Sequence, residues 1–248
     1  MITIKSAKQV EKMRASAKVT KEALELLEKH IKPGVTTAQL DKLAHDFIIS
    51  KGARPNFLNY SGFPGSICAS INDEVVHGIP SKKAVLKEGD IISIDMGAVL
   101  DGWHSDAART FAVGKISEEA QRLIDVTRES FFEGIKYLKH GAKLGDVSSA
   151  IQKYVEDRGF SVVRDLVGHG IGQNLHEDPS VPNFGKAGHG VKLAQGMTLA
   201  IEPMVNAGTY HVAVLDDDWT VVTDDGNLSA HYENTVLITK DGCEILTL

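Results

Sequence analysis

Four carboxylates and one histidine stand out in this sequence because together they could hold metal ions. They are Asp95, Asp106, His169, Glu202 and Glu233. Four negative charges balance two divalent cations, which makes a buried site of this kind electrostatically acceptable. One imidazole among oxygen ligands favours manganese, iron or cobalt over a structural zinc. Two ions about 3.5–4 Å apart can share a hydroxide and clamp a carbonyl group, so the residue types indicate hydrolysis at a two-metal centre.

An internal repeat supports this hypothesis. Residues 86–95 run from Leu-Lys-Glu-Gly through an apolar stretch to Asp95, and residues 193–202 run from Leu-Ala-Gln-Gly through a similar stretch to Glu202. The same offset separates three pairs of glycines, namely Gly34 and Gly141, Gly52 and Gly159, and Gly65 and Gly172. A repeat of this length predicts two similar half-domains. Each half would then send a strand that carries a carboxylate to one shared site.

Strand alternation predicts where the two acids point. Ser93 shares one strand face with Asp95, and the small Ala200 shares a face with Glu202, while the intervening residues are apolar. An isolated acid is usually a surface residue, and that alternative remains open for Asp106 and Glu233 taken singly. It fits Asp95 and Glu202 poorly because both end apolar strands. Asp101-Gly102 predicts a hairpin turn that brings Asp95 and Asp106 onto neighbouring strands.

The remaining pattern predicts an α+β fold. Helices are expected from Ser6 to the Lys-Pro-Gly sequence at 32–34, which ends the first, and from Thr36 to Gly52. Two more are expected, from about Ser117 to Lys139 and from after Gly141 to Arg158. Strands are expected at 66–71, 90–96, 107–113, 197–205, 219–223 and 232–238. We therefore expect one domain over residues 1–248. Its halves, at about 6–113 and 114–248, would be related by a pseudo-twofold axis and would share one curved antiparallel sheet.

Composition limits the class of protein. The chain has 248 residues, of which 42% are hydrophobic and 24% charged, as in ordinary globular proteins. The net charge of −6 argues against a general nucleic-acid or membrane-surface binder. Cys68 and Cys243 are the only cysteines, so no disulfide framework is implied and a cytoplasmic location is expected. The N-terminus has no apolar run long enough for a signal peptide or membrane span.

Several motifs resemble those of the methionine aminopeptidases. They are Gly168-His169-Gly170-Ile171-Gly172 with His176-Glu177, Ile201-Glu202-Pro203, Ser229-Ala230-His231-Tyr232-Glu233, and the run from Ser66-Ile67-Cys68 through Asn72 to His77-Gly78-Ile79-Pro80. The resemblance covers nearly the whole chain in order, and the set is far more specific than any one motif. It implies the pita-bread fold, which agrees with the internal repeat, and removal of the initiator methionine from new chains when the second residue is small.

The resemblance also implies a role for each site residue. His169 and Glu202 would hold one divalent ion (cobalt, manganese, iron or zinc) and Asp95 the other, with Asp106 and Glu233 bridging them. Glu202 would shuttle protons from the water or hydroxide that bridges the ions to the departing amine. His77 would face the scissile amide nitrogen, and His176 would hydrogen-bond the carbonyl oxygen as it gains charge.

Matching positions also imply a substrate pocket. Tyr60, Phe63, Cys68 and Trp219 would enclose the methionine side chain, since aromatic rings and a thiol suit a polarizable thioether. The alternative is that these four residues are simply core, and Phe57 is a less certain member. Asn72 and Ser229 match positions that offer backbone carbonyls to a monovalent cation, sodium or potassium.

The spacing of Glu202 and Glu233 leaves no room for the inserted subdomain of type II enzymes, and the first helix starts almost at Met1. A bacterial-style type I member, acting as a monomer on nascent polypeptides with transient ribosome contact, is therefore expected. Departures from the family occur at His231, Asn234 and Leu175, where many relatives have glutamine, histidine and a bulkier residue. Three alternatives remain: an Xaa-Pro peptidase, a non-catalytic peptide-binding relative, and a plain ligand-binding domain with incidental acids.

Overall fold

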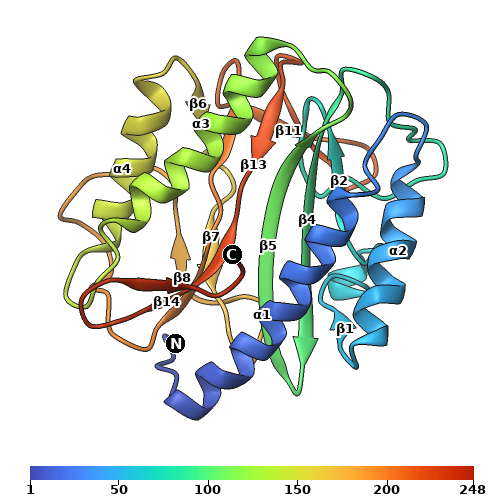
Figure 1. Ribbon diagram of the computed structural model, residues 1–248. Coiled ribbons are helices and arrows are strands. Elements are labelled where there is room, and N and C mark those ends of the chain that lie inside the picture. The colour runs from blue at the N-terminus through green and yellow to red at the C-terminus, as the bar shows by residue number, and fades with distance from the viewer.

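The four helices form two pairs, one in each half of the chain. They are α1 (Ala7–Glu28), α2 (Thr37–Ser50), α3 (Glu118–Ile135) and α4 (Leu144–Glu156). A computed structural model describes all residues 1–248, and Figure 1 shows α1 and α2 on one side of the strands with α3 and α4 on the other. The α+β prediction is confirmed. None of the helices is long and apolar enough to cross a membrane.

The strands are short except for one long hairpin in the centre of Figure 1, β4 (Ile91–Leu100) with β5 (Trp103–Ala112). The others are β1 (Arg54–Pro55), β2 (Cys68–Ile71), β3 (Glu74–Val76), β6 (Ser161–Val162), β7 (Gly168–Gly170), β8 (Glu177–Val181), β9 (Thr198–Ile201), β10 (Met204–Asn206), β11 (Val212–Val214), β12 (Val221–Thr223), β13 (Ser229–His231), β14 (Asn234–Ile238) and β15 (Cys243–Ile245). They pair antiparallel in four groups: β1, β4, β2 and β5; β13, β10 and β6; β11, β12 and β3; and β15, β14, β9, β7 and β8.

The repeated glycines have matching local geometry. Gly34 and Gly141 both have φ of 89°, and their N–H groups donate to Leu86 O and Leu193 O at 2.8 Å. A positive φ of this size is strained for any residue with a Cβ atom, which explains why glycine recurs. The sequence repeat therefore reflects a turn that is built twice.

The two halves meet along β5. The N–H of Glu233 donates to Ala108 O at 2.9 Å, and the N–H of Ala108 donates back to Glu233 O at 3.4 Å. On one side of this pair the Thr110 hydroxyl bonds the backbone of His231, and on the other the Thr235 hydroxyl bonds the backbone of Asp106. Two threonine hydroxyls thus continue the contact between the halves beyond the paired backbone of Ala108 and Glu233. In place of the single shared sheet that we expected, separate strand ladders are connected at β5.

One predicted strand is wrong in detail. Residues 197–205 form two strands, β9 and β10, separated by Glu202-Pro203. Proline has no N–H to donate and interrupts the ladder. The break places Glu202 immediately after β9, beside the cavity described below, instead of within a continuous strand.

The apolar strand faces are buried against the helices as the alternation predicts. Ile92 and Ile94 lie in the core cluster that packs under α1 and α2, and Leu199 and Ile201 lie in the cluster under α3 and α4. Asp95 and Glu202 therefore face away from both cores, toward the space between the halves.

A buried ion pair ties the N-terminal segment to the second half. Lys5 Nζ lies 2.7 Å from Glu177 Oε2, with the side chains only 4% and 7% exposed. Replacing Lys5 by alanine should lower the free energy of unfolding by about 3 kcal/mol, because it leaves a buried carboxylate unpaired. Denaturant unfolding of the metal-free protein measures this. The exposed pair Lys42–Asp46 is the control, and its Lys42→Ala variant should lose under about 1 kcal/mol. An equally small loss for Lys5→Ala would contradict the assignment.

Candidate metal centre

The β4–β5 hairpin brings the first two acids together. Asp101 and Gly102 form its turn with φ of 50° and 77°, the positive values that a two-residue type I′ turn requires. In this register Asp95 lies opposite Ala108, and Asp106 lies opposite Gly97. Asp95 and Asp106 are thus diagonal neighbours on one face, and the residues opposite them are small. The sequence prediction of this hairpin is confirmed.

Glu233 reaches the same face from the second half. Its backbone pairs with Ala108, the residue opposite Asp95. Behind it, the Arg109 guanidinium donates to the carbonyl oxygens of Ala108 and Glu233, and to Asn234 Oδ1 at 2.7 Å. Arg109 therefore holds the backbone on which Glu233 is mounted.

His169 and Glu202 complete the group. His169 on β7 lies opposite Ala200 on β9, two residues before Glu202. Its Nε2 atom is 3.7 Å from Glu202 Oε1 and 4.0 Å from Asp106 Oδ2. Its Nδ1 atom is 2.8 Å from Gly170 O, to which an Nδ1–H group donates. This bond leaves the Nε2 lone pair free for a cation, as is usual for histidine ligands.

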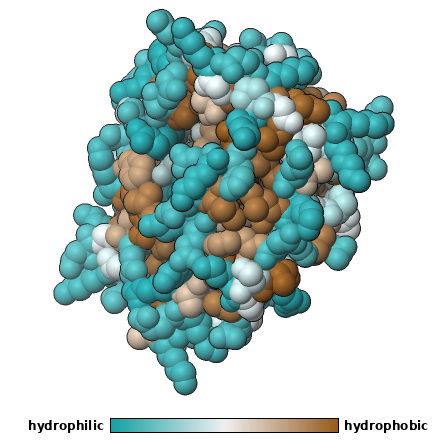
Figure 2. All heavy atoms as spheres, turned by 45° about the vertical axis from the view of Figure 1, so that its right-hand side comes forward, coloured by the Kyte–Doolittle hydropathy of each residue, from teal (hydrophilic) through white to brown (hydrophobic).

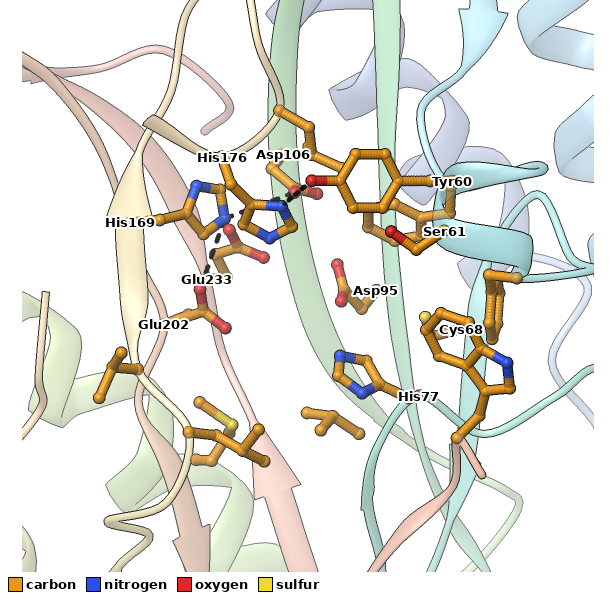
Figure 3. Close-up of a pocket in the computed structure, with 18 residues that line it drawn as sticks. Tyr60, Ser61, Cys68, His77, Asp95, Asp106, His169, His176, Glu202 and Glu233 are labelled. Carbon is orange, nitrogen blue, oxygen red and sulfur yellow. Dashed lines mark hydrogen bonds and ion pairs between the residues drawn. The ribbon is translucent and has the colours of Figure 1, made fainter. Parts of the chain in front are cut away.

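All five side chains border one cavity of about 250 Å³ between the halves. Figure 3 shows the carboxylates of Asp95, Glu202 and Glu233 converging in it from different segments of the chain. One ligand atom from each of Asp106, His169 and Glu233 lies within 4.8 Å of the others. Buried oxygens of Asp95, Asp106 and Glu233 have no hydrogen-bond partner. Buried polar atoms normally have a partner, and no hydrogen-bond donor in the protein reaches these oxygens. A cluster of such carboxylate oxygens beside a neutral imidazole nitrogen fits divalent cations.

Burial and mutual repulsion shift the acids toward their protonated forms. Burial raises the pKa of Asp95 to about 7. Burial, and next the charge of Asp95, raise the pKa values of Asp106 and Glu202 well above their usual range. Burial, and next the charge of Asp106, do the same for the pKa of Glu233. Burial lowers the pKa of His169 to about 4, so its imidazole is neutral at pH 7. Metal-free, the site is costly to ionise, and cations would relieve that cost.

We expect added Mn²⁺ to raise the midpoint of thermal unfolding more at pH 8 than at pH 5. In the metal-free protein, carboxyl groups with raised pKa such as Asp95 hold protons that the unfolded chain releases. Their contribution therefore makes the folded state less stable as pH rises from about 4 toward 7. Bound cations replace those protons, and proton competition weakens their binding at pH 5.

Calorimetry with and without Mn²⁺ at both pH values measures the shift in the unfolding midpoint that the metal causes. Groups that titrate without contacting metal affect both samples equally at each pH, so their effect cancels from this shift. An equal or larger metal-induced shift at pH 5 would contradict binding through these carboxylates.

The opposite wall of the cavity is aromatic. Phe63 and Trp219 meet edge to face with ring centroids 5.1 Å apart. Cys68 on β2 lies opposite Asp95 on β4. Burial, and next the charge of Asp95, raise the pKa of the Cys68 thiol, so it stays neutral. Tyr60 stands at the side of the cavity (Figure 3). The four residues predicted to form the substrate pocket all line this one space.

Two further histidines face the acids. His77 lies across the cavity from Glu202, and His176 lies next to His169 with ring centroids 4.2 Å apart (Figure 3). Burial lowers the pKa of both His77 and His176, so both are neutral at pH 7. His77 has φ of 61°, a left-handed conformation that is uncommon for residues other than glycine. Such backbone strain clusters at functional sites.

The cavity also contains residues that the sequence reasoning did not select. They are Ser61, Val76, Leu166, Val167 and Met204, with Phe57, the less certain member, also present. Strand alternation could have indicated Met204, because it follows Glu202 by two residues. Val76 could have been found as the neighbour of His77, which it directly precedes. No local pattern marks Leu166 and Val167. On the face of the molecule drawn in Figure 2, hydrophobic side chains lie between hydrophilic ones.

The three departures from the family pattern have distinct environments. His231 is buried, and its Nε2 atom lies 3.7 Å from Glu202 Oε2. Asn234 accepts from Arg109 behind Glu233, and Leu175 lines the cavity. None removes one of the five predicted ligands. Away from the cavity, the N–H of Ser229 donates to Asn72 O at 2.9 Å, so these two backbones are adjacent.

Comparison with known proteins agrees with this geometry. A sequence model of metallopeptidase family M24 matches residues 11–240. The chain belongs to this family. It is 61% identical over its full length to a methionine aminopeptidase from Clostridium acetobutylicum, and covers 99% of that protein. Within the M24 metallopeptidases it therefore belongs with the methionine aminopeptidases, as the resemblance implied.

Solved structures give the same result. The crystal structure of methionine aminopeptidase from Rickettsia prowazekii superposes with a TM-score of 0.98 at 48% identity, and each chain covers all of the other. A prolidase from Pyrococcus furiosus has a TM-score of 0.80 at 21% identity, and this M24 chain covers 65% of it. The prolidase shares the fold alone. The pita-bread fold is thus confirmed, and the similarity over the whole chain favours the bacterial methionine aminopeptidases over Xaa-Pro peptidases.

Proposed function

We propose that this M24 metallopeptidase removes the N-terminal methionine from peptides and nascent proteins whose second residue is small. The observation that carries the proposal is the composition of one cavity. Five predicted metal ligands line one wall, and Tyr60, Phe63, Cys68 and Trp219 line the other. A site with a nearby apolar pocket for one side chain suits cleavage after a single terminal residue. The protein acts on polypeptides and uses divalent metal.

The five ligands would divide as the resemblance implies. His169 and Glu202 would hold one ion and Asp95 the other, and Asp106 and Glu233 would serve as ligands to both. Divalent ions held there would polarise the substrate carbonyl and lower the pKa of water. Manganese, iron or cobalt suit this mostly oxygen donor set, and zinc is also accepted by such ligands.

The surrounding side chains then supply binding and proton transfer. The aromatic wall and Cys68 enclose the thioether and exclude water from it. Glu202 would accept a proton from the attacking water and return it to the departing amine, because its carboxylate lies in the cavity where the substrate would bind. Neutral His77 contacts the amide nitrogen, and neutral His176 donates to the carbonyl oxygen as it gains charge.

The test is release of free methionine from Met-Ala-Ser and Met-Lys-Ser peptides by metal-stripped protein refilled with manganese, iron, cobalt or zinc. Cleavage of the first peptide alone, and only with metal, is expected. Absence of cleavage with metal shown to be bound would favour an Xaa-Pro peptidase or a non-catalytic peptide-binding relative. Release of free glycine from a Gly-Pro-Ser peptide under the same conditions distinguishes these two, because only an Xaa-Pro peptidase would cleave it.

Further assignments belong to the proposal. The protein works as a cytoplasmic monomer in transient contact with the ribosome, near the point where new N-termini emerge. Backbone carbonyls near Asn72 and Ser229, which the 2.9 Å hydrogen bond brings together, would hold a sodium or potassium ion. Halves 6–113 and 114–248 form one catalytic domain.

A further inference from the structure

A hydrogen bond crosses the edge of the cavity between the two halves of the chain. The Tyr60 hydroxyl oxygen lies 2.7 Å from Nδ1 of His176, and the ring centroids are 5.2 Å apart (Figure 3). On its other side the His176 ring packs against His169, with centroids 4.2 Å apart. No other hydrogen bond reaches either nitrogen of His176. Its second nitrogen, Nε2, points into the cavity (Figure 3).

This contact bears on where His176 carries its proton. A neutral imidazole has one N–H and one lone pair, and which nitrogen is protonated is set by the bond that the other makes. A phenol can donate or accept, but an imidazole nitrogen is a better acceptor than a phenol oxygen. Donation from Tyr60 to Nδ1 is therefore the favoured arrangement. It leaves the proton on Nε2, toward the cavity.

Tyr60 lies in a tight turn, and the backbone of this turn fixes the position of its side chain. Asn59 and Ser61, on either side, have φ of 65° and 50°. The N–H of Asn59 donates to Phe63 O at 2.8 Å, and the N–H of Phe63 donates to Tyr60 O at 2.9 Å. The turn is thus held by its own backbone bonds, and Tyr60 is 41% exposed. Loss of the hydroxyl alone should leave the turn intact.

We propose that Tyr60 is a positioning residue whose hydroxyl donates to Nδ1 of His176 and thereby keeps the ring proton on Nε2, where it can meet the substrate carbonyl. The inference rests on the proposed function, which places His176 against that oxygen. It gives Tyr60 a role beyond that of a pocket wall. A ring without the hydroxyl would still form the wall but would not select the tautomer.

The test is Tyr60→Phe, measured by 15N NMR of histidine-labelled protein loaded with diamagnetic zinc at pH 8. In the wild type we expect His176, assigned through His176→Gln, to show a protonated Nε2 and an unprotonated Nδ1. In Tyr60→Phe the two nitrogens should move toward intermediate shifts. The kcat for methionine release should fall about 10-fold, as for loss of one hydrogen bond, with KM and metal content changed less than about twofold.

Tyr137→Phe, at an exposed tyrosine outside the cavity, is the matched control and should change none of these quantities. A wild-type His176 with its proton on Nδ1 would overturn the inference. So would a Tyr60→Phe protein whose tautomer is unchanged, whether or not its activity falls, because Tyr60 would then act only as a wall. The NMR signature needs no substrate. Failure of the assigned function would appear separately, as a wild type that releases no methionine.

Discussion

Replacing Glu202 by alanine should reduce methionine release on the order of 10³-fold and also weaken metal binding. Glu202 follows β9 directly, and its Oε1 atom lies 3.7 Å from Nε2 of His169. General acid–base groups contribute roughly 10²- to 10⁴-fold to rate. Changes to outer-shell partners already cost about 10- to 100-fold in metal affinity, so losing a direct ligand should cost at least as much. Turnover of Met-Ala-Ser and calorimetric titration with Mn²⁺ measure the two effects.

Two variants sharpen this experiment. Glu202→Gln keeps the volume and one carbonyl oxygen but cannot take up a proton, so it should retain more metal than Glu202→Ala while turning over as slowly. Glu28→Ala, at an exposed position where α1 ends, should leave both quantities unchanged. Full metal affinity in Glu202→Ala would remove Glu202 from the ligand set. Full turnover in Glu202→Gln would remove it from proton transfer.

Replacing His77 by alanine should reduce kcat/KM about 100-fold with little loss of metal. His77 lines the cavity across from Glu202 and is not one of the five predicted ligands. A neutral imidazole that contacts the scissile amide helps chiefly in the transition state, so kcat should carry most of the loss. Stopped assays of Met-Ala-Ser, together with metal content from elemental analysis, separate the effect on rate from the effect on binding.

The matched control for His77 is His189→Ala, an exposed loop histidine. It should keep wild-type rate and metal content. Because His77 has a left-handed backbone, alanine at this position also carries some strain, so the unfolding midpoint must be measured alongside. If His77→Ala turns over at the wild-type rate, the assigned contact with the amide nitrogen is wrong. If it loses metal, His77 contributes to the metal site instead.

The sequence alone predicted much of the centre because local patterns carry that information. The hairpin turn at Asp101-Gly102 requires two positive φ values, and it places Asp95 near Asp106. The alternation around Ile92 and Ile94 decides which face is apolar. The glycine repeat marks turns that are built twice. These features depend on residues close in sequence, whose conformations follow from their own chemistry.

The tertiary structure alone decided the contacts that cross between the halves. Thr110 and Thr235 bond the backbone of the opposite half, Arg109 supports the Glu233 backbone, and the Tyr60 hydroxyl meets His176. The partners are more than 100 residues apart in sequence, and the distances between their atoms depend on how the strands of the two halves pack together. Local sequence patterns carry no information about that packing. The sequence by itself therefore predicted which residues carry the chemistry, and only the packing of the two halves decided which side chains hold them in place.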